Sequence, residues 1–217
     1  MKRFELTSET KVIFGHALHR IRALISFGDV AGGELGGWVE KEANLCQYGS
    51  AWVYGNAMVS DNALVSGNAM VSGDAWVSDN ARVYGNAWVY GNARVSGDAR
   101  VYGDAWVSDN ARVYGDAWVS GNARVSGDAR VYGQGSIFWI GAVGSRNGTT
   151  TFFACKDKKI RVSCGCFFGD LDEFAAKVNT THGDNQHAKV YMLAIEMAKA
   201  RIDLDAIPDD EEESHEP

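Results

Sequence analysis

Hydrophobic and polar positions between residues 51 and 131 follow a six-residue period that is never interrupted. Valine recurs at every sixth position, fourteen times from Val53 to Val131, and an alanine lies two positions before each valine. The unit reads Ala-x-Val-(Tyr/Ser)-(Gly/Asp)-(Asn/Asp). Because successive side chains of a β-strand point to opposite sides, Ala and Val share one face while x and Tyr/Ser share the other. The pattern predicts short strands that bury Ala and Val, separated by two-residue turns.

These short strands are best accommodated in a coil. Six is not a multiple of 3.6, so a helix would scatter the valines, and hairpins between such short strands would bury little. Three strands close a triangular coil of 18 residues, and successive coils stack with parallel strands about 4.8 Å apart. At the first turn position, Asp61, Asp79 and Asp109 replace glycine, which is acceptable because Asp tolerates the left-handed conformation. We expect an all-β solenoid with three strands per coil.

The repeat resembles the hexapeptide repeat of left-handed β-helix proteins, as in Val53…Ala57 and Val59…Ala63, where a small residue follows an aliphatic one by four positions. The resemblance implies a left-handed parallel β-helix. Those families usually have Gly directly after the aliphatic residue, where this chain has Tyr or Ser. The segment before the repeat, including Gly36-Gly37-Trp38-Val39, is similar to bacterial and prophage hexapeptide proteins, some of which are labelled putative acetyltransferases. The likeness covers roughly residues 18–134.

Four regions follow from this pattern. Residues 1–50 are expected to form an N-terminal cap with strands over 18–24 and 36–40 and a degenerate first coil marked by Val39 and Leu45. Residues 51–134 form the β-helix. Residues 135–205 form a small C-terminal α+β domain, with strands over 137–140, 150–154 and 160–163, a helix over 171–179 capped by Asp170, and a longer helix capped by Asp184 or Asn185 that ends near Ile202. Residues 206–217 form an acidic, disordered tail.

Residues 18 apart stack on one outer face of the predicted coil, so the sequence can be sorted into surfaces. One face carries large apolar side chains, and soluble monomers rarely expose such a stripe. We predict that it joins copies of the chain into a dimer or trimer. The alternatives are that the terminal domains cover the face or that its aromatic side chains are isolated surface residues. The predicted interface residues are Trp52, Tyr54, Met70, Trp88, Tyr90 and Trp106.

The other two faces combine arginine with tyrosine, which suits an anionic or planar ligand or a partner protein. The alternative is an ordinary solvated exterior. The candidate residues are Arg82, Tyr84, Arg94, Arg100, Tyr102, Arg112, Tyr114 and Arg130.

Charge and composition narrow the function. Eight acidic residues between Asp203 and Glu216 account for the net charge of −7, so a basic footprint is missing and nucleic-acid binding is not favoured. We find no apolar stretch typical of a signal peptide or membrane span. Four cysteines match no disulfide framework, so a cytoplasmic location is expected.

Candidate chemistry is sparse. Hexapeptide acyltransferases generally use a histidine base in the coils or in a loop extruded from them, but no histidine lies between His19 and His182 and no loop interrupts the fourteen units. Cys155, Cys164 and Cys166 with His182 or His187 are a weak zinc candidate, since Cys-x-Cys is unusual spacing. We expect no metal, no cofactor and no catalytic residue, while His16 and His19 belong to the N-terminal cap.

The expected function is therefore that of a non-enzymatic, oligomeric binding or scaffold protein, encoded by a phage or prophage. A narrower version is an inhibitor or sponge that acts on a host defence protein or a nucleotide signal. Its partners would be itself and a host protein or small anionic ligand, with no membrane. The competing hypothesis is an acyltransferase of the hexapeptide acetyltransferase type.

Overall fold

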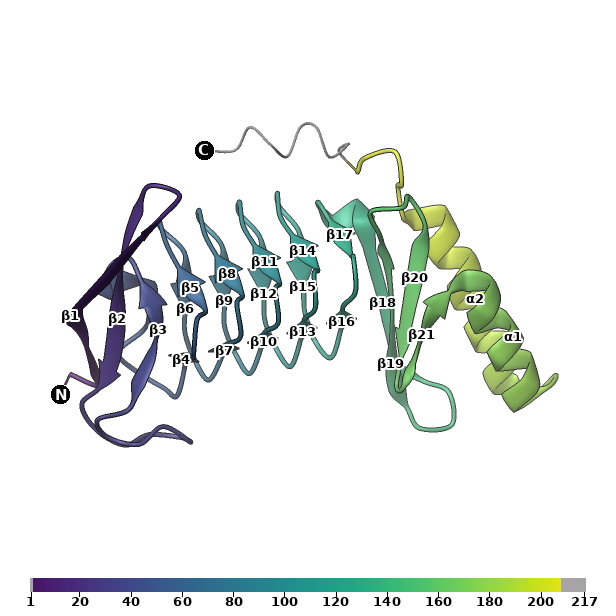
Figure 1. The fold of residues 1–217 in the computed structure, drawn as a ribbon. Helices are drawn as coiled ribbons and strands as arrows, with labels where there is room; N and C mark the ends of the chain where they lie inside the picture. Colours follow the sequence, from purple (N-terminus) through teal and green to yellow (C-terminus); the bar gives the residue numbers. More distant parts are fainter. Residues whose placement is uncertain (1, 208–217) are drawn as a thin grey trace.

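The computed structural model describes residues 2–207. Its centre is a β-solenoid of about five turns; a β-hairpin lies at the N-terminal end, and a four-stranded sheet with two helices lies at the other (Figure 1). The predicted solenoid with three strands per coil is confirmed. Its left-handed sense remains a prediction.

The N-terminal cap begins with a strand that sequence analysis missed. The strand β1 (Phe4–Ile13) pairs antiparallel with β2 (His16–Ala23), and β2 pairs with β3 (Leu35–Val39). The turn between β1 and β2 uses positive φ at Phe14 (48°) and Gly15 (87°). Phe lacks the tolerance for this conformation that Asn and Gly have, so the turn carried no recognisable hairpin signal.

The degenerate first coil is present and is two residues longer than the others. Val39 pairs with Val59, and Leu45 forms a bridge with Val65, so both partners lie 20 residues further along the chain. The buried Arg3 fastens the longer segment, because its guanidinium donates to the carbonyl oxygens of Cys46 (2.6 Å) and Ala51 (2.8 Å). The N-terminal arm thus closes the irregular coil.

Fourteen two-residue strands form the solenoid, each pairing in parallel with the strand 18 residues away. They stack into three sheets: β3-β5-β8-β11-β14-β17, which β1 and β2 extend, β4-β7-β10-β13-β16, and β6-β9-β12-β15. The strands are β4 (Trp52–Val53), β5 (Met58–Val59), β6 (Leu64–Val65), β7 (Met70–Val71), β8 (Trp76–Val77), β9 (Arg82–Val83), β10 (Trp88–Val89), β11 (Arg94–Val95), β12 (Arg100–Val101), β13 (Trp106–Val107), β14 (Arg112–Val113), β15 (Trp118–Val119), β16 (Arg124–Val125) and β17 (Arg130–Val131).

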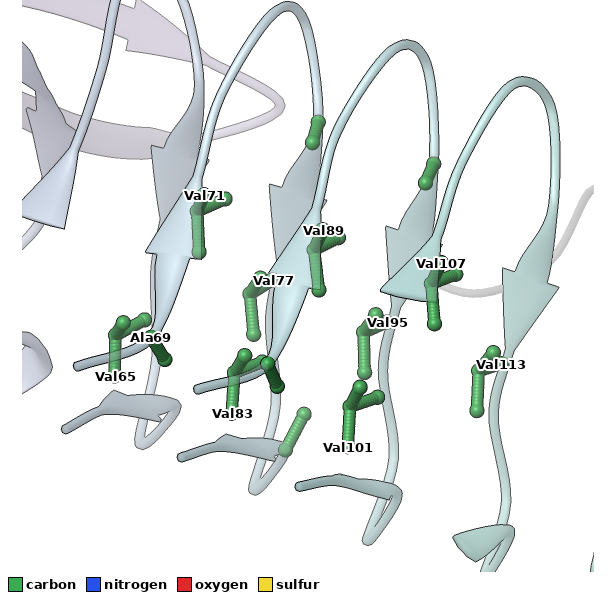
Figure 2. Packing of buried hydrophobic residues seen from close by; sticks show 14 of the residues in the cluster. Val65, Ala69, Val71, Val77, Val83, Val89, Val95, Val101, Val107 and Val113 are labelled. Carbon is green, nitrogen blue, oxygen red and sulfur yellow. The ribbon is translucent and has the colours of Figure 1, made fainter. Parts of the chain in front are cut away.

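The interior of the solenoid is a continuous column of valine and alanine. Every valine of the repeat is fully buried, and every alanine is at most 1% exposed. Figure 2 shows Val71, Val89 and Val107 from one sheet facing Val77 and Val95 from another across the interior. No polar side chain of the repeat enters this column, so it determines architecture and leaves recognition to the outer positions.

The turns confirm the expected use of aspartate in place of glycine. Asp61, Asp79 and Asp109 have φ between 56° and 59°. The carboxylate of Asp79 accepts a hydrogen bond from the backbone N–H of Gly97 (2.9 Å), and that of Asp109 accepts one from Gly127 (3.0 Å). Aspartate thus satisfies a backbone donor of the next coil in addition to tolerating the left-handed conformation.

The C-terminal domain is the predicted α+β unit. Its antiparallel strands are β18 (Ile137–Val143), β19 (Gly148–Ala154), β20 (Ile160–Cys164) and β21 (Phe167–Asp170), of which β21 was not predicted. The helix α1 (Leu171–His182) has Asp170 as N-cap, and α2 (Gln186–Arg201) has Asn185. Phe153 and Ile137 cover the last coil, which shields its open end.

The helices pack on the sheet around a second core that includes Phe152, Phe174 and Tyr191. Ile207 is also buried there. The tail predicted over 206–217 therefore starts too early, because its second residue packs in this core. Residues 208–217 lie outside the described residues. Within 2–207, no helix is long and apolar enough to cross a membrane.

Candidate functional site

The outer side chains of the solenoid form vertical columns because the repeat places each one directly over its neighbour. Backbone hydrogen bonds between coils fix the spacing: the Arg82 N–H donates to Ala99 O (2.9 Å), and the Arg100 N–H donates to Ala117 O (2.8 Å). Each outer residue is followed by a valine that is fully buried. The attachment points of the surface side chains are thus held rigidly.

A groove of about 510 Å³ runs along the β6-β9-β12-β15 sheet. It is lined by Asn80, Arg82, Asp98, Arg100, Asp116, Trp118 and Gln134. One side consists of turn residues, each two positions before the strand residue that forms the other side. The groove therefore spans several coils and repeats the same pair of positions along its length.

The two arginines of the groove are exposed, and their side chains are free to bind a ligand. Arg82 and Arg100 pair directly across β9 and β12, and the Arg100 guanidinium lies 5.1 Å from the centre of the Trp118 ring. Among the ion pairs of residues 2–207, neither Arg82 nor Arg100 takes part. An arginine without a carboxylate partner retains its full set of donors for a ligand.

The opposite side of the groove carries two carboxylates in adjacent coils, Asp98 and Asp116. At the other two corners of the triangular coil, the side-chain amide of an asparagine donates a hydrogen bond to the residue one coil further on. Examples are Asn86 to Asp104 (2.9 Å) and Asn110 to Asp128 (3.2 Å). An aspartate has no amide N–H, so two stacked aspartates lack this bond. The groove consequently offers both signs of charge beside an indole ring.

The eight residues predicted for an anionic ligand divide between two sides of the molecule. Arg82, Arg100, Tyr84 and Tyr102 belong to one sheet and its border, where the two tyrosine rings stack with centroids 5.0 Å apart. The other four lie on a different sheet or at its border: Arg94, Arg112, Tyr114 and Arg130.

Arg130 does not belong to a ligand surface. Its side chain is buried beneath the C-terminal domain and donates to the backbone oxygens of Ala129 (3.1 Å) and Asn110 (3.4 Å). The prediction was wrong for this residue because the sequence pattern does not reveal where the C-terminal domain sits.

The predicted apolar face is real only in part. Trp52 is fully buried, with Phe4 and Phe27 edge-on against its ring, so its assignment to an interface was wrong. Tyr54 packs against the same core. Its pKa is raised, mainly by burial and to a smaller extent by the negative charges of Glu34 and Asp29. The N-terminal cap therefore covers the beginning of this face.

The remainder of the face is an aromatic ladder. Trp88 and Trp106 stack with centroids 5.3 Å apart and an interplanar angle of 8°. Tyr90 packs edge-on against Trp106, and Arg124 lies 4.6 Å over the Trp106 ring. Trp88 is 38% exposed, and Met70 precedes it in the column. These residues form a continuous surface of four coils.

The cysteines are not gathered into one site. Cys155 is buried against the last coil, and its pKa is raised to about 12, mainly by burial. Cys164 lies beside Tyr191. The pKa of Tyr191 is raised to about 12, first by burial and second by the neighbouring Cys164. Cys166 is exposed. Within 2–207, these cysteines and His182 do not converge as metal ligands, so the weak zinc candidate has no geometric support.

The four histidines among residues 2–207 lie at the two ends of the described structure. His16 and His19 belong to β2 of the N-terminal cap, as expected, while His182 and His187 lie on the helices with ring centroids 5.6 Å apart. Neither pair lines the groove. Sequence reasoning missed Asp98, Asp116 and Trp118 as groove residues, although the 18-residue spacing that sorted the arginines also places these three.

Comparison with known proteins adds to the repeat. The family described as YdcK beta solenoid repeat matches residues 51–67, 63–79, 75–91, 87–103, 93–109 and 105–121. No curated protein matches the chain. The matched segments lie within strands β4–β15. The chain is therefore a repeat β-helix protein, and its solenoid between residues 51 and 121 is similar to the YdcK beta solenoid repeat.

Proposed function

We propose that this protein is a non-enzymatic binding module, which recognises a partner protein through the groove of the β6-β9-β12-β15 sheet. The observation that supports it most is the pair of exposed guanidiniums, Arg82 and Arg100, held one coil apart without a carboxylate ion-pair partner among residues 2–207. Arg and Trp are the residue types that dominate binding energy in protein interfaces, and Trp118 stands next in the same column.

The rigid backbone favours binding at this groove. Ordering a flexible surface costs free energy on association, and a preorganised one avoids much of that cost. Here the coil-to-coil hydrogen bonds and the buried valines fix each Cα, so only the side-chain rotamers of the arginines need to be ordered. A partner with groups spaced by about 4.8 Å would match successive coils.

The charge of the groove favours a protein over a nucleotide signal. Asp98 and Asp116 face the same space as the two arginines, and a phosphate that pairs with the guanidiniums would also meet two carboxylates. A protein segment can present both acidic and basic side chains, which satisfies both sides of the groove. We therefore favour the scaffold form of the hypothesis over the nucleotide sponge.

The acyltransferase alternative receives less support from the same geometry. A general base has to reach the proton that it abstracts, and among residues 2–207 no histidine lines the groove. His182 and His187 lie on the outer helices, beyond the sheet that covers the last coil. The groove offers arginine, aspartate and indole groups, which suit recognition.

Self-association belongs to the proposal as a second surface. The ladder of Met70, Trp88 and Trp106, with Tyr90 beside it, is the part of the predicted interface that remains accessible. A two-fold dimer would bury this face on both copies and leave the groove open. The proposal includes a phage or prophage origin. It also includes a cytoplasmic location, because the four cysteines are free thiols, as is usual in a reducing compartment.

Affinity capture from native host cells tests it. The bait is the whole chain, compared with the variants Arg82→Glu/Arg100→Glu and, as a matched control with two arginines one coil apart on another sheet, Arg94→Glu/Arg112→Glu. We expect a defined protein to be captured by the wild type and the control but lost with the groove variant. Capture that survives in the groove variant would contradict the assignment of this surface. Saturable binding of acetyl-CoA, measured by calorimetry on the wild type, would favour the transferase instead.

A further inference from the structure

Three side chains from separate segments meet beside the N-terminal hairpin: His16 at the start of β2, Glu40 directly after β3, and Asp61 in the turn after β5. The His16 Nδ1 atom lies 3.5 Å from Glu40 Oε1 and 3.7 Å from Asp61 Oδ1. The three donor atoms all lie within 4.8 Å of one another. We infer that this triad binds one divalent first-row transition-metal ion of the zinc class.

The two carboxylates are oriented by bonds to their other oxygens. Glu40 Oε2 accepts the backbone N–H of Asp61, which leaves Oε1 directed at His16. Asp61 Oδ2 accepts from the Ser60 hydroxyl (3.0 Å) and from the backbone N–H of Asp79 (3.3 Å), which leaves Oδ1 directed at the same imidazole nitrogen. Supporting hydrogen bonds of this kind are what hold ligands in place at metal sites.

A second layer extends this support. The fully buried Ser60 accepts a hydrogen bond from the Trp76 indole N–H (3.0 Å) at the same hydroxyl that donates to Asp61. The His16 ring packs edge-on against Trp76, and Phe14 stacks on the indole with centroids 5.3 Å apart. The three ligand side chains are only 20% to 32% exposed. The aromatic wall thus shields the cluster and fixes the imidazole.

The spacing and chemistry fit a tetrahedral ion. Two atoms that each lie about 2.1 Å from a tetrahedral zinc ion are about 3.4 Å apart, close to the observed 3.5 and 3.7 Å. One imidazole and two carboxylates also suit zinc, cobalt and manganese better than calcium, which prefers six or more oxygen ligands. Three protein ligands leave one position for solvent.

Charge points in the same direction. Glu40 and Asp61 bring two negative groups together, and among residues 2–207 the ion-pair partner of each is His16. The nearest lysine in sequence, Lys41, instead donates to Asn62 Oδ1 (3.1 Å). A divalent cation would neutralise both carboxylates and would fasten the hairpin to the first regular coil. The site therefore serves to lock the N-terminal cap.

The test is a titration of the chelator-stripped whole chain with Zn²⁺ by calorimetry, and with Co²⁺ by its visible absorption. We expect one ion per chain, with the dissociation constant raised at least about 100-fold in His16→Ala and Asp61→Asn and about 10-fold in Ser60→Ala. Asp79→Asn is the matched control, since Asp79 occupies the same turn position one coil further on, and it should bind like the wild type.

Two further arms keep the result decisive. Glu40→Gln preserves shape and should also weaken binding, while circular dichroism of each metal-free variant confirms folding. Binding that is unchanged in His16→Ala but lost in His182→Ala would assign the ion to the C-terminal helices, where His182 and His187 lie next to each other. That result would overturn the inference. The absence of stoichiometric binding of either ion to the folded wild type would overturn it as well.

Discussion

The indole rings of Trp88 and Trp106 lie face to face, with centroids 5.3 Å apart, on adjacent coils of one outer sheet. Their separation matches the coil spacing, so the stack follows directly from placing tryptophan at two positions 18 residues apart. Contiguous exposed aromatic side chains often mark an interaction surface, and we propose that this one joins copies of the chain.

Replacing both rings tests that reason. We expect Trp88→Ala/Trp106→Ala to shift the chain from oligomer to monomer in light scattering, because the variant loses most of the apolar area of the face. Arg94→Ala, an exposed residue of another sheet, is the control and should leave the oligomer intact. An unchanged ratio of monomer to oligomer in the double variant would contradict the interface.

Glycine at the turns has two separable roles, which a matched pair of substitutions distinguishes. Gly97 and Gly165 have similar φ angles, +66° and +61°, but a Cβ at Gly97 would lie 2.9 Å from the backbone nitrogen of Gly115, whereas one at Gly165 would meet open space. Both Ala variants incur about 1–2 kcal/mol for the left-handed conformation. Gly97→Ala should lose at least about 1 kcal/mol more, as measured by urea unfolding. Equal losses would show that adjacent coils are free to separate.

The buried Cys155 thiol provides a test of the junction between solenoid and C-terminal domain. Its pKa is raised to about 12, compared with about 8.5 in an unfolded chain. At pH 8.5 we therefore expect alkylation of the exposed Cys166, with Cys155 protected until the protein unfolds. Peptide mapping by mass spectrometry gives the order of labelling, and rapid labelling of native Cys155 would contradict a closed junction.

The same thiol predicts a direction of pH dependence. Above about pH 8.5 the unfolded thiol releases its proton while the folded one retains it, so the free energy of unfolding falls as pH rises toward 12. Tyr191, whose pKa is also raised to about 12, adds to this loss above about pH 10. Cys155→Ala should show a smaller decrease in denaturant midpoint between pH 8.5 and 10 than the wild type.

The repeat allowed most of the solenoid to be predicted, because one periodic signal determines strand, turn and stacking together. Even the left-handed backbone at Asp61, Asp79 and Asp109 followed from the residue type. The predictions that were wrong concern residues at the two ends of the solenoid. Trp52 reads as a surface residue by its spacing, but Phe4 and Phe27, which bury it, come from outside the repeat.

The site could be predicted to a similar extent. Spacing by 18 identifies Arg82 and Arg100 as neighbours and, applied to turn residues, would also pair Asp98 with Asp116. The spacing cannot reveal the contacts of His16 with Glu40 and Asp61, because His16 belongs to the N-terminal hairpin, which lies outside the repeat. Nor does it reveal that the C-terminal domain covers Arg130. Long-range contacts of non-repeating segments leave no periodic trace.

The most direct measurement of the central claim is photo-crosslinking in native host cells, with a photoreactive amino acid replacing Trp118, Arg94 or Leu193 in turn. Trp118 lines the groove, Arg94 lies on another sheet, and the 65% exposed Leu193 lines a separate hollow along α2. We predict one defined protein adduct from position 118 that is missing from positions 94 and 193. An adduct only from position 193, or equal adducts from all three, would contradict recognition through the groove.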